Sequence, residues 1–452
     1  MNLPNYFLAD LPPEATLTPA LMAEACRTLR RNRERYLAHR TTDEIIATLA
    51  ELGRAWLTPG NRFRGLALEH GPGRTGYGRV TIERGLDAFF GQLTAENLQA
   101  LVAQDLGDRS VLDGFCPLPG GRRAALARGP QLLVHIAAGN LPNPAFLSLV
   151  LGLLTRSAQF LKCASGAAFF PRLFAHSLYA VDAKLASCLE VAEWRGGNTA
   201  LEQALLTAAD CVTATGGDEA LVALRAKVPA HVRFVGHGHR VSFGFVADGA
   251  LAAGLASEVA ARAAADVAAW DQAGCLSPHL FYVQHGREAG ARRFAELLAG
   301  ELERLEGIQP RGVLPAETAA SIAARRAVYE VRAAHSPQTQ LWHSAGSTAW
   351  TVVYEEEPQF QLSCLNRFVY VKPVADLAEA LRAAEPVREK VSTVGLAAPH
   401  GEAEALARRL AQWGVSRVCP IGRMQQPPLT WRHDGRPALG DLVTWTDFER
   451  NP

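Results

Sequence analysis

The stretch "QLLVHIAAGNLPNPAFLSLVLGLLTRSAQFLKCAS" (131–165) carries the pattern that decides the fold. A short aliphatic run is followed by a proline-flanked apolar run of helical length, and then by a second short apolar run. Two strands separated by a helix of this length specify a right-handed crossover between neighbouring parallel strands. The stretch therefore predicts one strand–helix–strand unit of a largely parallel sheet.

The same alternation continues along the chain. Further strand candidates before the middle of the chain are "CLEVAEW" (188–194), "DCVTATGG" (210–217) and "HVRFVG" (231–236). A second series, from about Ser242 to Gly422, has strand candidates at 280–285, 348–355, 367–374, 392–398 and 417–422. Residues 1 to about 110 have helical character, and the last thirty residues, rich in proline and aromatics, predict an extended arm. The chain is thus expected to be an α/β protein with helices on both faces of its sheets.

Composition narrows the class of protein. The chain has 452 residues, 48% of them hydrophobic, and a formal net charge of +1, so no overall field favours nucleic acid or an anionic membrane. The longest apolar stretch, 145–154, is about half of the ~20 residues that a membrane span needs. The N-terminus lacks the pattern of a secretory signal, so we expect a cytoplasmic protein. The eight cysteines form no CxxC pair, which argues against a disulfide framework and against a zinc site.

One cysteine has a distinctive setting. The run "LAAGLASEVAARAAADVAAW" (251–270) has apolar residues at helical spacing and should end near Asp271. Gly274 and Pro278 then place Cys275 in a short loop before a strand. A partly exposed thiol there suits a nucleophile, although a buried, inert thiol is an equally good interpretation of position alone. The other seven cysteines are expected to pack as small hydrophobic side chains.

Two polar residues follow strands of the first series. Asn140 stands between a strand and a proline-started helix, where it could donate a hydrogen bond to an oxyanion or, more simply, cap the helix. Lys162 ends the strand "AQFLKCAS", at the edge where open α/β sheets bind ligands, or it extends along the surface. The G-x-G-x-x-G match "GPGRTG" (71–76) precedes the strand-like "GRVTIE", so we expect a flexible loop and no dinucleotide turn.

Four blocks in order carry a family resemblance: "AGNLP" (138–142), "GGDEAL" (216–221), "DQAGCLS" (271–277) and "HDGRPALGDLVTW" (433–445). With them the chain resembles the LuxC-type acyl-CoA reductases, the fatty-acid reductase component of bacterial bioluminescence, within the aldehyde dehydrogenase superfamily. The resemblance implies an aldehyde dehydrogenase-like fold with a Rossmann-type cofactor domain, an α/β catalytic domain and a C-terminal oligomerisation arm. The expected boundaries are 1–115 for a helical region packed on the cofactor domain, 116–243 for the cofactor domain, 244–422 for the catalytic domain and 423–452 for the arm.

The resemblance also assigns roles to residues. It makes Cys275 the nucleophile and Asn140 an oxyanion donor, alongside the backbone N–H of Cys275. Lys162 matches the lysine that contacts the adenosine ribose, and Ser165 stands where NAD-preferring relatives often carry a glutamate. Because a serine does not repel a 2′-phosphate, NADPH is the expected cofactor. Gly216 and Gly217 are expected to line the nicotinamide side, although the acidic residues that follow them disfavour phosphate contact.

The predicted activity is the reduction of a fatty acyl-CoA to a fatty aldehyde through a cysteine thioacyl-enzyme. Hydrolytic aldehyde dehydrogenases carry a general-base glutamate in a segment that here reads "FVGHGHRVSFGFV" (234–246), which contains no acid. This departure fits a reductase, because a base that activates water would destroy the thioester. His279, His237 and His239 are conceivable proton donors, each better explained by a structural role.

Alternatives and partners remain open at this point. The chain could be an NAD(P)-dependent aldehyde dehydrogenase that oxidises aldehydes, or a non-catalytic acyl carrier or scaffold. The resemblance implies a homo-oligomer and allows an acyl-protein synthetase as partner. No nucleic acid, membrane span or metal is expected. The sequence leaves open the acyl chain length and whether the donor is acyl-CoA or an acyl-protein.

Overall fold

The structure is a computed structural model that describes residues 3–12, 14–120, 122–252, 254–284 and 290–449. The chain divides into two compact units. Unit 1 comprises Met1–Thr75, Leu86–Gly238 and Pro428–Pro452, and unit 2 comprises Gly76–Gly85 and His239–Pro427. Neither unit is one continuous stretch of chain.

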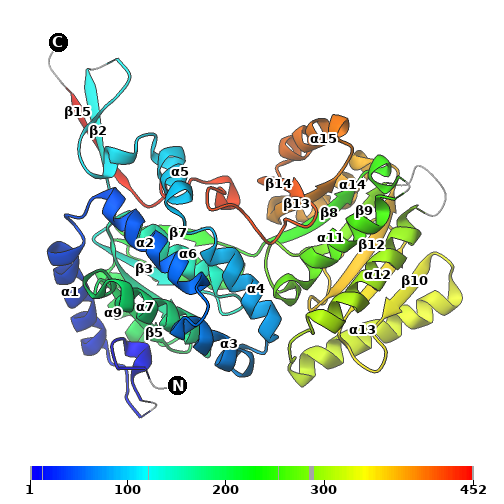
Figure 1. The fold of residues 1–452 in the computed structure, drawn as a ribbon, viewed down its shortest axis with the longest axis horizontal. Helices are drawn as coiled ribbons and strands as arrows, with labels where there is room; N and C mark the ends of the chain where they lie inside the picture. The colour runs from blue at the N-terminus through cyan, green and yellow to red at the C-terminus, as the bar shows by residue number, and fades with distance from the viewer. Residues whose placement is uncertain (1–2, 13, 121, 253, 285–289, 450–452) are drawn as a thin grey trace. The chain divides into compact units, whose positions relative to one another are not determined.

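Unit 1 is built on a five-stranded parallel sheet in the order β5-β4-β3-β6-β7 (Figure 1). The strands are β3 (Leu132–Ile136), β4 (Ala158–Cys163), β5 (Leu189–Glu193), β6 (Cys211–Thr215) and β7 (Arg233–His237). The chain proceeds outward from β3 to β5 on one side and then returns to β6 on the other side. The strand order therefore reverses between β3 and β6, the position where open α/β sheets bind ligands.

Helices cover both faces of this sheet. On one face, α1 (Pro19–Tyr36) and α9 (Thr199–Ala208) pack through Met22 and Leu205 against Val134 and Phe160. The other helices of unit 1 are α2 (Thr42–Leu57), α3 (Arg62–Thr75), α5 (Ala95–Leu106), α6 (Asn143–Leu154), α7 (Phe169–Val181), α8 (Ala183–Ala186) and α10 (Asp218–Arg225), and α4 (Arg79–Phe90) crosses the boundary between the units. A stack of buried rings on α4, α6 and α7 holds these helices together: Phe90, Phe146 and Phe174.

Unit 2 contains a seven-stranded sheet in the order β10-β11-β12-β9-β8-β13-β14, in which only β10 pairs antiparallel among the described strands. Its strands are β8 (Val241–Val246), β9 (Pro278–Gln284), β10 (Thr339–His343), β11 (Thr351–Glu355), β12 (Phe368–Val374), β13 (Val391–Ala397) and β14 (Arg417–Pro420). Strand β9 lies near the centre and is buried along both faces. The loop that leads into β9 is consequently attached to a strand with neighbours on both sides.

Alternate residues of β9 face two separate cores. Phe281 and Val283 pack with α11 (Ala256–Ala268) and α12 (Gly290–Ile308). Leu280 and Tyr282 pack with α13 (Ala316–His335), α14 (Leu377–Ala383) and α15 (His400–Trp413). Successive side chains of β9 therefore alternate between the two cores, and the strand is largely apolar because both of its faces are covered. Within the described residues, no helix combines the length and apolar character that a bilayer span requires.

A third, antiparallel sheet lies in unit 1 and contains β1 (Cys116–Pro117), β2 (Arg123–Arg128) and β15 (Thr444–Glu449). Figure 1 shows β2 and β15 side by side near the C-terminus. The segment before β15, where the sequence predicted an extended arm, includes only one short 3-10 helix at His433–Gly435 among its described residues. Strand β15, near the C-terminus, thus pairs with strand β2 from the first third of the sequence.

The prediction for residues 71–83 is wrong. The "GPGRT" residues, predicted as a flexible loop, end helix α3, and "GRVTIE", predicted as strand-like, belongs largely to helix α4. Ile82, Leu86 and Phe90 recur every four residues and are fully or almost fully buried, so burial of this helical face outweighs the β propensity of Val and Thr. The match to G-x-G-x-x-G has no role as a dinucleotide turn, as the sequence analysis concluded.

Candidate active site

Cys275 lies in the loop between the 3-10 helix η4 (Ala269–Gln272) and strand β9. All eight cysteines fall within the described residues, and Cys275 is the one classed as exposed. Burial raises the pKa of Cys163 to about 12 and that of Cys419 to about 11. These thiols stay protonated at neutral pH, which is the behaviour expected of packing cysteines.

The backbone around Cys275 is fixed from several directions. The Gln272 side chain donates to the carbonyls of Pro278 and Phe368, both at 2.8 Å, so it ties the start of the loop to its end and to β12. The Ser242 hydroxyl of β8 donates to the carbonyl of Cys275 at 2.8 Å and accepts the N–H of Thr393 at 3.2 Å. An exposed sulfur is thereby carried on a loop whose backbone is anchored in the sheet.

The histidine nearest in sequence to Cys275 does not suit the role of proton donor. His279 is buried, and its Nδ1 accepts the backbone N–H of Ser363 at 3.1 Å. Burial, together with the positive charge of His239, lowers the pKa of His279 to about 4. The ring is consequently neutral at physiological pH and serves to hold the Ser363 segment against β9.

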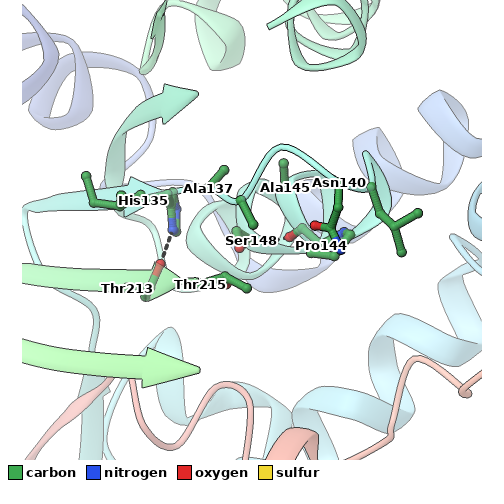
Figure 2. A pocket seen from close by; sticks show the side chains of 11 residues that line it. His135, Ala137, Asn140, Pro144, Ala145, Ser148, Thr213 and Thr215 are labelled. Atoms are coloured by element: carbon green, nitrogen blue, oxygen red, sulfur yellow. Dashed lines mark hydrogen bonds between the residues drawn. The ribbon is translucent and has the colours of Figure 1, made fainter. Parts of the chain in front are cut away.

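Asn140 lies in the loop between β3 and α6, at the reversal of the strand order in unit 1. It lines a pocket of about 290 Å³, counting the space open to solvent, together with Thr213 and Thr215 of β6 (Figure 2). Pro142 occupies the N-cap position of α6, and Asn140 lies two residues before it. Asn140 is exposed at the carboxyl edge of the sheet, where open α/β sheets bind ligands.

A buried histidine forms one wall of this pocket. His135 lies in β3, with Nε2 2.8 Å from Gln159 Oε1 and Nδ1 2.6 Å from the Thr213 hydroxyl. Because the amide oxygen can only accept, Nε2 carries the proton and Thr213 donates to Nδ1. Burial lowers the pKa of His135 to about 4, so the ring is neutral and ties three neighbouring strands together.

Lys162 is buried at the end of β4, so it is not a solvent-exposed surface lysine. Its Nζ lies 5.5 Å from the centroid of the Trp194 ring. Burial lowers the pKa of Lys162, and the nearby Glu202 and Glu193 carboxylates partly offset that effect. Glu202 is itself paired with Lys227 at 2.7 Å, so two lysines and two acids gather at this end of the sheet.

The loop that follows Lys162 is held by an acid that the sequence analysis missed. Glu193, the last residue of β5, accepts the N–H groups of Gly166 and Ala168 at 2.7 and 3.0 Å, and Ser165 beside them is exposed. The sequence signal that could have indicated this role was an acidic residue at the carboxyl end of the strand that pairs with β4. A carboxylate therefore lies near Ser165, although it comes from the neighbouring strand.

Gly216 and Gly217 connect β6 to α10. Gly216 donates its N–H to the carbonyl of His237 at 3.2 Å, and Gly217 is the N-cap of α10. A Cβ at Gly217 would meet no atom within 4 Å. The turn is thus open on its outer side, and together with Asn140 it borders the reversal point of unit 1. Cys275 belongs to unit 2.

His237, His433 and Asp434 form a cluster in unit 1 whose ligand-type atoms lie within 4.8 Å of one another. Asp434 Oδ2 is 3.0 Å from His237 Nδ1, and the Arg436 guanidinium is 3.3 Å from the same nitrogen. The two imidazole rings are parallel, with centroids 4.3 Å apart, so their in-plane lone pairs do not converge on one point. This geometry favours an ion-pair cluster that binds the C-terminal segment to β7.

Comparison with known families decides the classification. The family model described as "Acyl-CoA reductase (LuxC)" matches residues 37–445, which is most of the chain. The chain belongs to the LuxC acyl-CoA reductase family. The resemblance seen in the sequence is confirmed, and the protein is an oxidoreductase of this family.

Relatives and solved structures agree with membership of the LuxC family. The "Long-chain acyl-protein thioester reductase 2" of Photobacterium leiognathi is 25% identical over 78% of this chain and 71% of its own length. Proline utilization A superposes with a TM-score of 0.74 at 18% identity, over 96% of this chain but only 45% of that longer chain. The putative aldehyde dehydrogenase PutA of Anabaena variabilis gives a TM-score of 0.71 at 16% identity, covering 96% and 93% of the two chains. The aldehyde dehydrogenase-like fold is therefore confirmed.

In this LuxC-family chain the segment without an acid, 234–246, forms β7 and β8 and the connection between them. The acid closest in sequence to Cys275 is Asp271, which is buried and bonded to Arg367 at 2.7 and 3.0 Å. Its other oxygen accepts the N–H of Gly312 at 3.0 Å. This carboxylate is fully engaged and is not available to activate water.

Proposed function

We propose that this LuxC-family protein reduces a long-chain fatty acyl thioester to a fatty aldehyde, with Cys275 as nucleophile and NADPH as cofactor. The observation that carries the proposal is the exposed Cys275 sulfur on an anchored loop, while the other cysteines are buried or half-buried. The family and the name of the Photobacterium relative supply the substrate class.

In the proposed reaction the Cys275 thiolate attacks the carbonyl carbon of the acyl thioester. A new C–S bond forms to Cys275, the bond to the carrier thiol breaks, and the carrier leaves as a thiol after taking up a proton. Reduction of the resulting thioester takes up one hydride at the carbonyl carbon, and cleavage of the C–S bond to Cys275 then releases the aldehyde. The nucleophile is regenerated as the thiolate, so the one proton consumed overall is the proton taken up by the carrier thiol.

Negative charge develops on the acyl oxygen in both tetrahedral stages. Two donors of this chain would stabilise it, namely the carboxamide of Asn140 and the backbone N–H of Cys275. One such donor is worth about 3 kcal/mol in comparable enzymes. The exposed position of Asn140 at the reversal of the unit 1 sheet supports this role.

A nicotinamide dinucleotide fits the residues at the carboxyl edge of the unit 1 sheet. Lys162 is a buried cation at the end of β4, and the Gly216–Gly217 turn is open to close backbone approach. A bound reduced nicotinamide would supply the hydride. NADPH is proposed over NADH because Ser165 is exposed and uncharged in its loop, and both oxygens of Glu193 are engaged by backbone N–H groups.

Reduction is favoured over aldehyde oxidation because no carboxylate near Cys275 in sequence is available to activate water. Aldehyde oxidation to an acid requires an activated water, and segment 234–246 supplies no carboxylate. Asp271 is fully bonded, as described above. The thioester would therefore persist long enough to be reduced.

The test is an assay of purified protein with a C14 acyl-CoA and NADPH, in which loss of reduced nicotinamide and trapped aldehyde are followed together. When the protein is incubated with acyl-CoA in the absence of NADPH, the acyl-enzyme should accumulate. Mass spectrometry should then show the mass of one acyl group added to the peptide that contains Cys275. Cys275→Ala should abolish both signals, whereas Cys419→Ala, which removes a half-buried thiol of the same unit, should retain them. Turnover that survives Cys275→Ala would reject the covalent mechanism.

The same protein should be assayed with an acyl-protein donor, because the relative's name specifies that carrier. Faster turnover from an acylated synthetase than from acyl-CoA would make the synthetase the natural partner. We also propose that the chain forms a homo-oligomer through the sheet of β1, β2 and β15, which exposes aromatic residues at Phe115, Trp445 and Phe448.

A further inference from the structure

Two short segments of unit 2 have an unusual backbone. Trp270, Asp271 and Gln272 have φ values of 49°, 48° and 64°, and Leu365, Asn366 and Arg367 have values of 59°, 55° and 67°. None of the six is glycine, and residues other than Gly, Asn and Asp rarely adopt a left-handed conformation because their Cβ then crowds the following carbonyl oxygen. Conformations of this kind persist only when surrounding contacts impose them, and they concentrate at functional sites.

The first segment leads directly into the proposed nucleophile loop, and the second leads into β12. A buried ion pair joins them: Asp271 Oδ1 accepts from Arg367 Nη2 at 2.7 Å and from Nε at 3.0 Å. The Arg367 side chain is 0% exposed and that of Asp271 is 4% exposed. The remaining guanidinium nitrogen, Nη1, donates to Glu306 at 2.9 Å.

The next residue extends this linkage. Gln272 donates to the carbonyl of Phe368, the residue after Arg367, and to the carbonyl of Pro278 on the far side of Cys275. The side chains of Asp271, Gln272 and Arg367 therefore connect both left-handed segments to each other and to both ends of the Cys275 loop. A change in the Asp271–Arg367 distance would be passed to the backbone that carries the sulfur.

We propose that the Asp271–Arg367 ion pair is a positioning device that sets the geometry of the Cys275 thiol for attack on the thioester. This inference rests on the proposed role of Cys275. Neither residue touches the reacting atoms; the pair acts through the backbone of 272–278. A buried pair of this kind brings little net stability over a well-packed apolar pair, so its benefit here is the fixed loop conformation.

The principal variant is Asp271→Asn. Asparagine tolerates the left-handed conformation and has nearly the same shape, so the substitution removes the charge and one acceptor without altering the backbone preference. In the wild type, one oxygen of Asp271 accepts from Arg367 and the other accepts from the N–H of Gly312. The amide nitrogen of the new asparagine can only donate, so in either orientation it would face one of these donors and one hydrogen bond would be lost. Arg367→Lys is the second variant, since it keeps the charge but cannot make the two-nitrogen contact.

The matched control is Glu355→Gln. Glu355 is a buried carboxylate 3.4 Å from Lys372 in the same sheet. It stands four residues along β11 from Thr351, whose partner Phe368 adjoins Arg367, so it lies about 13 Å further along the strand direction. A general loss of stability from a broken buried pair would appear in this control as well.

Two readouts are taken from each variant. The rate at which acyl-CoA acylates Cys275 is measured by rapid quenching and mass spectrometry, and amide hydrogen exchange is measured for residues 272–278. We expect Asp271→Asn to slow acylation about 10- to 100-fold, the effect of a misplacement near 1 Å. Exchange in the loop should accelerate, Arg367→Lys should give an intermediate result, and Glu355→Gln should match the wild type in both readouts.

Acylation by Asp271→Asn at the wild-type rate would overturn the inference, as would an equal loss in Glu355→Gln. Failure of the wild-type protein to become acylated would instead reject the proposed function. Hydrogen exchange then decides the positioning role by itself: a loop loosened only by the Asp271 and Arg367 variants supports it, and an unchanged loop refutes it.

Discussion

At the scale of single residues, polar side chains of this chain divide between those that meet solvent and those that hold strands together. Asn140 and Ser165 are exposed at the edge of the unit 1 sheet, whereas His135 and His279 are buried, neutral and bonded. Gly274 and Pro278 predicted a loop at Cys275, since both disfavour continuation of a helix or strand, but they left open whether the sulfur is exposed. The sequence could not reveal the engagement of Glu193, because hydrogen bonds to a loop from a neighbouring strand depend on the tertiary arrangement.

Substitution of Ser165 by glutamate should reverse the proposed cofactor preference. A carboxylate in this exposed loop would repel the 2′-phosphate of NADPH and would accept hydrogen bonds from the ribose hydroxyls of NADH. We expect the Kd for NADPH to rise at least ~10-fold, equivalent to about 1.4 kcal/mol, with little change for NADH. Fluorescence titration of each dinucleotide measures this without turnover, and Ser165→Ala is the control. Equal losses for both cofactors would contradict the assignment.

Burial of His135 should make the protein acid-sensitive. The folded-state pKa of about 4 lies below the ordinary 6.5, so the unfolded chain binds more protons between these values. The stabilising contribution is therefore complete above pH 6.5 and is lost as the pH falls towards 4, by roughly 3 kcal/mol at most. Urea unfolding at pH 7, 6 and 5 should show a shallower pH dependence in His135→Gln than in the wild type. His39→Gln, at an exposed position, should leave the slope unchanged.

At the scale of elements, alternation predicted the central strands and helices of both units correctly, because their apolar runs are bounded by turn residues. The sequence did not predict strand β8, Val241–Val246, in which Ser242 and Gly244 interrupt the apolar residues although all six positions are buried. The left-handed segments at Trp270–Gln272 and Leu365–Arg367 also escaped prediction, since they contain no glycine to indicate positive φ. The strand-like interpretation of residues 78–83 rested on the β-branched Val80, Thr81 and Ile82 and did not take account of the four-residue spacing of the buried positions in helix α4.

Contact between α4 and η4 makes one glycine indispensable. A Cβ at Gly85 would lie 2.0 Å from Cζ2 of the buried Trp270 ring. Gly85→Ala should therefore destabilise the protein by about 1–3 kcal/mol despite the better helix propensity of alanine. Gly65→Ala in α3, where a Cβ meets nothing within 4 Å, should instead be neutral or stabilising by up to ~1 kcal/mol. Thermal unfolding of the two variants compares them directly, and a stabilised Gly85→Ala would contradict the packing argument.

At the scale of the whole molecule, family and fold could be predicted from four ordered sequence blocks, because the motifs mark the ends of strands. The path of the chain between the two units could not be predicted from the sequence. Residues 76–85 belong with unit 2 although 153 residues, 86–238, separate them from the rest of that unit. Long-range assignments of this kind depend on which buried faces meet, and local patterns do not encode them.

The exposed aromatic residues of the small sheet should govern self-association. Phe448 is 50% exposed and pairs with Phe115 at 5.6 Å between ring centroids on this sheet. If the sheet forms the proposed homo-oligomer contact, Phe448→Glu should lower the mass measured by light scattering after size exclusion. Val222→Glu, which changes another strongly exposed apolar residue in α10, is the control. A wild-type protein that is monomeric at assay concentrations would refute the proposal.

The discontinuity of unit 2 also constrains how the protein can be dissected and how it is synthesised. Trp270, at the entrance to the nucleophile loop, packs against Gly85 and has its ring centroid 5.2 Å from that of Tyr77, both supplied by an early piece of chain. On the ribosome these residues emerge long before their indole partner, and a recombinant fragment limited to 239–427 would leave that indole facing water. Such a fragment would retain Cys275, the proposed nucleophile, but would lack the early residues that pack against the start of its loop.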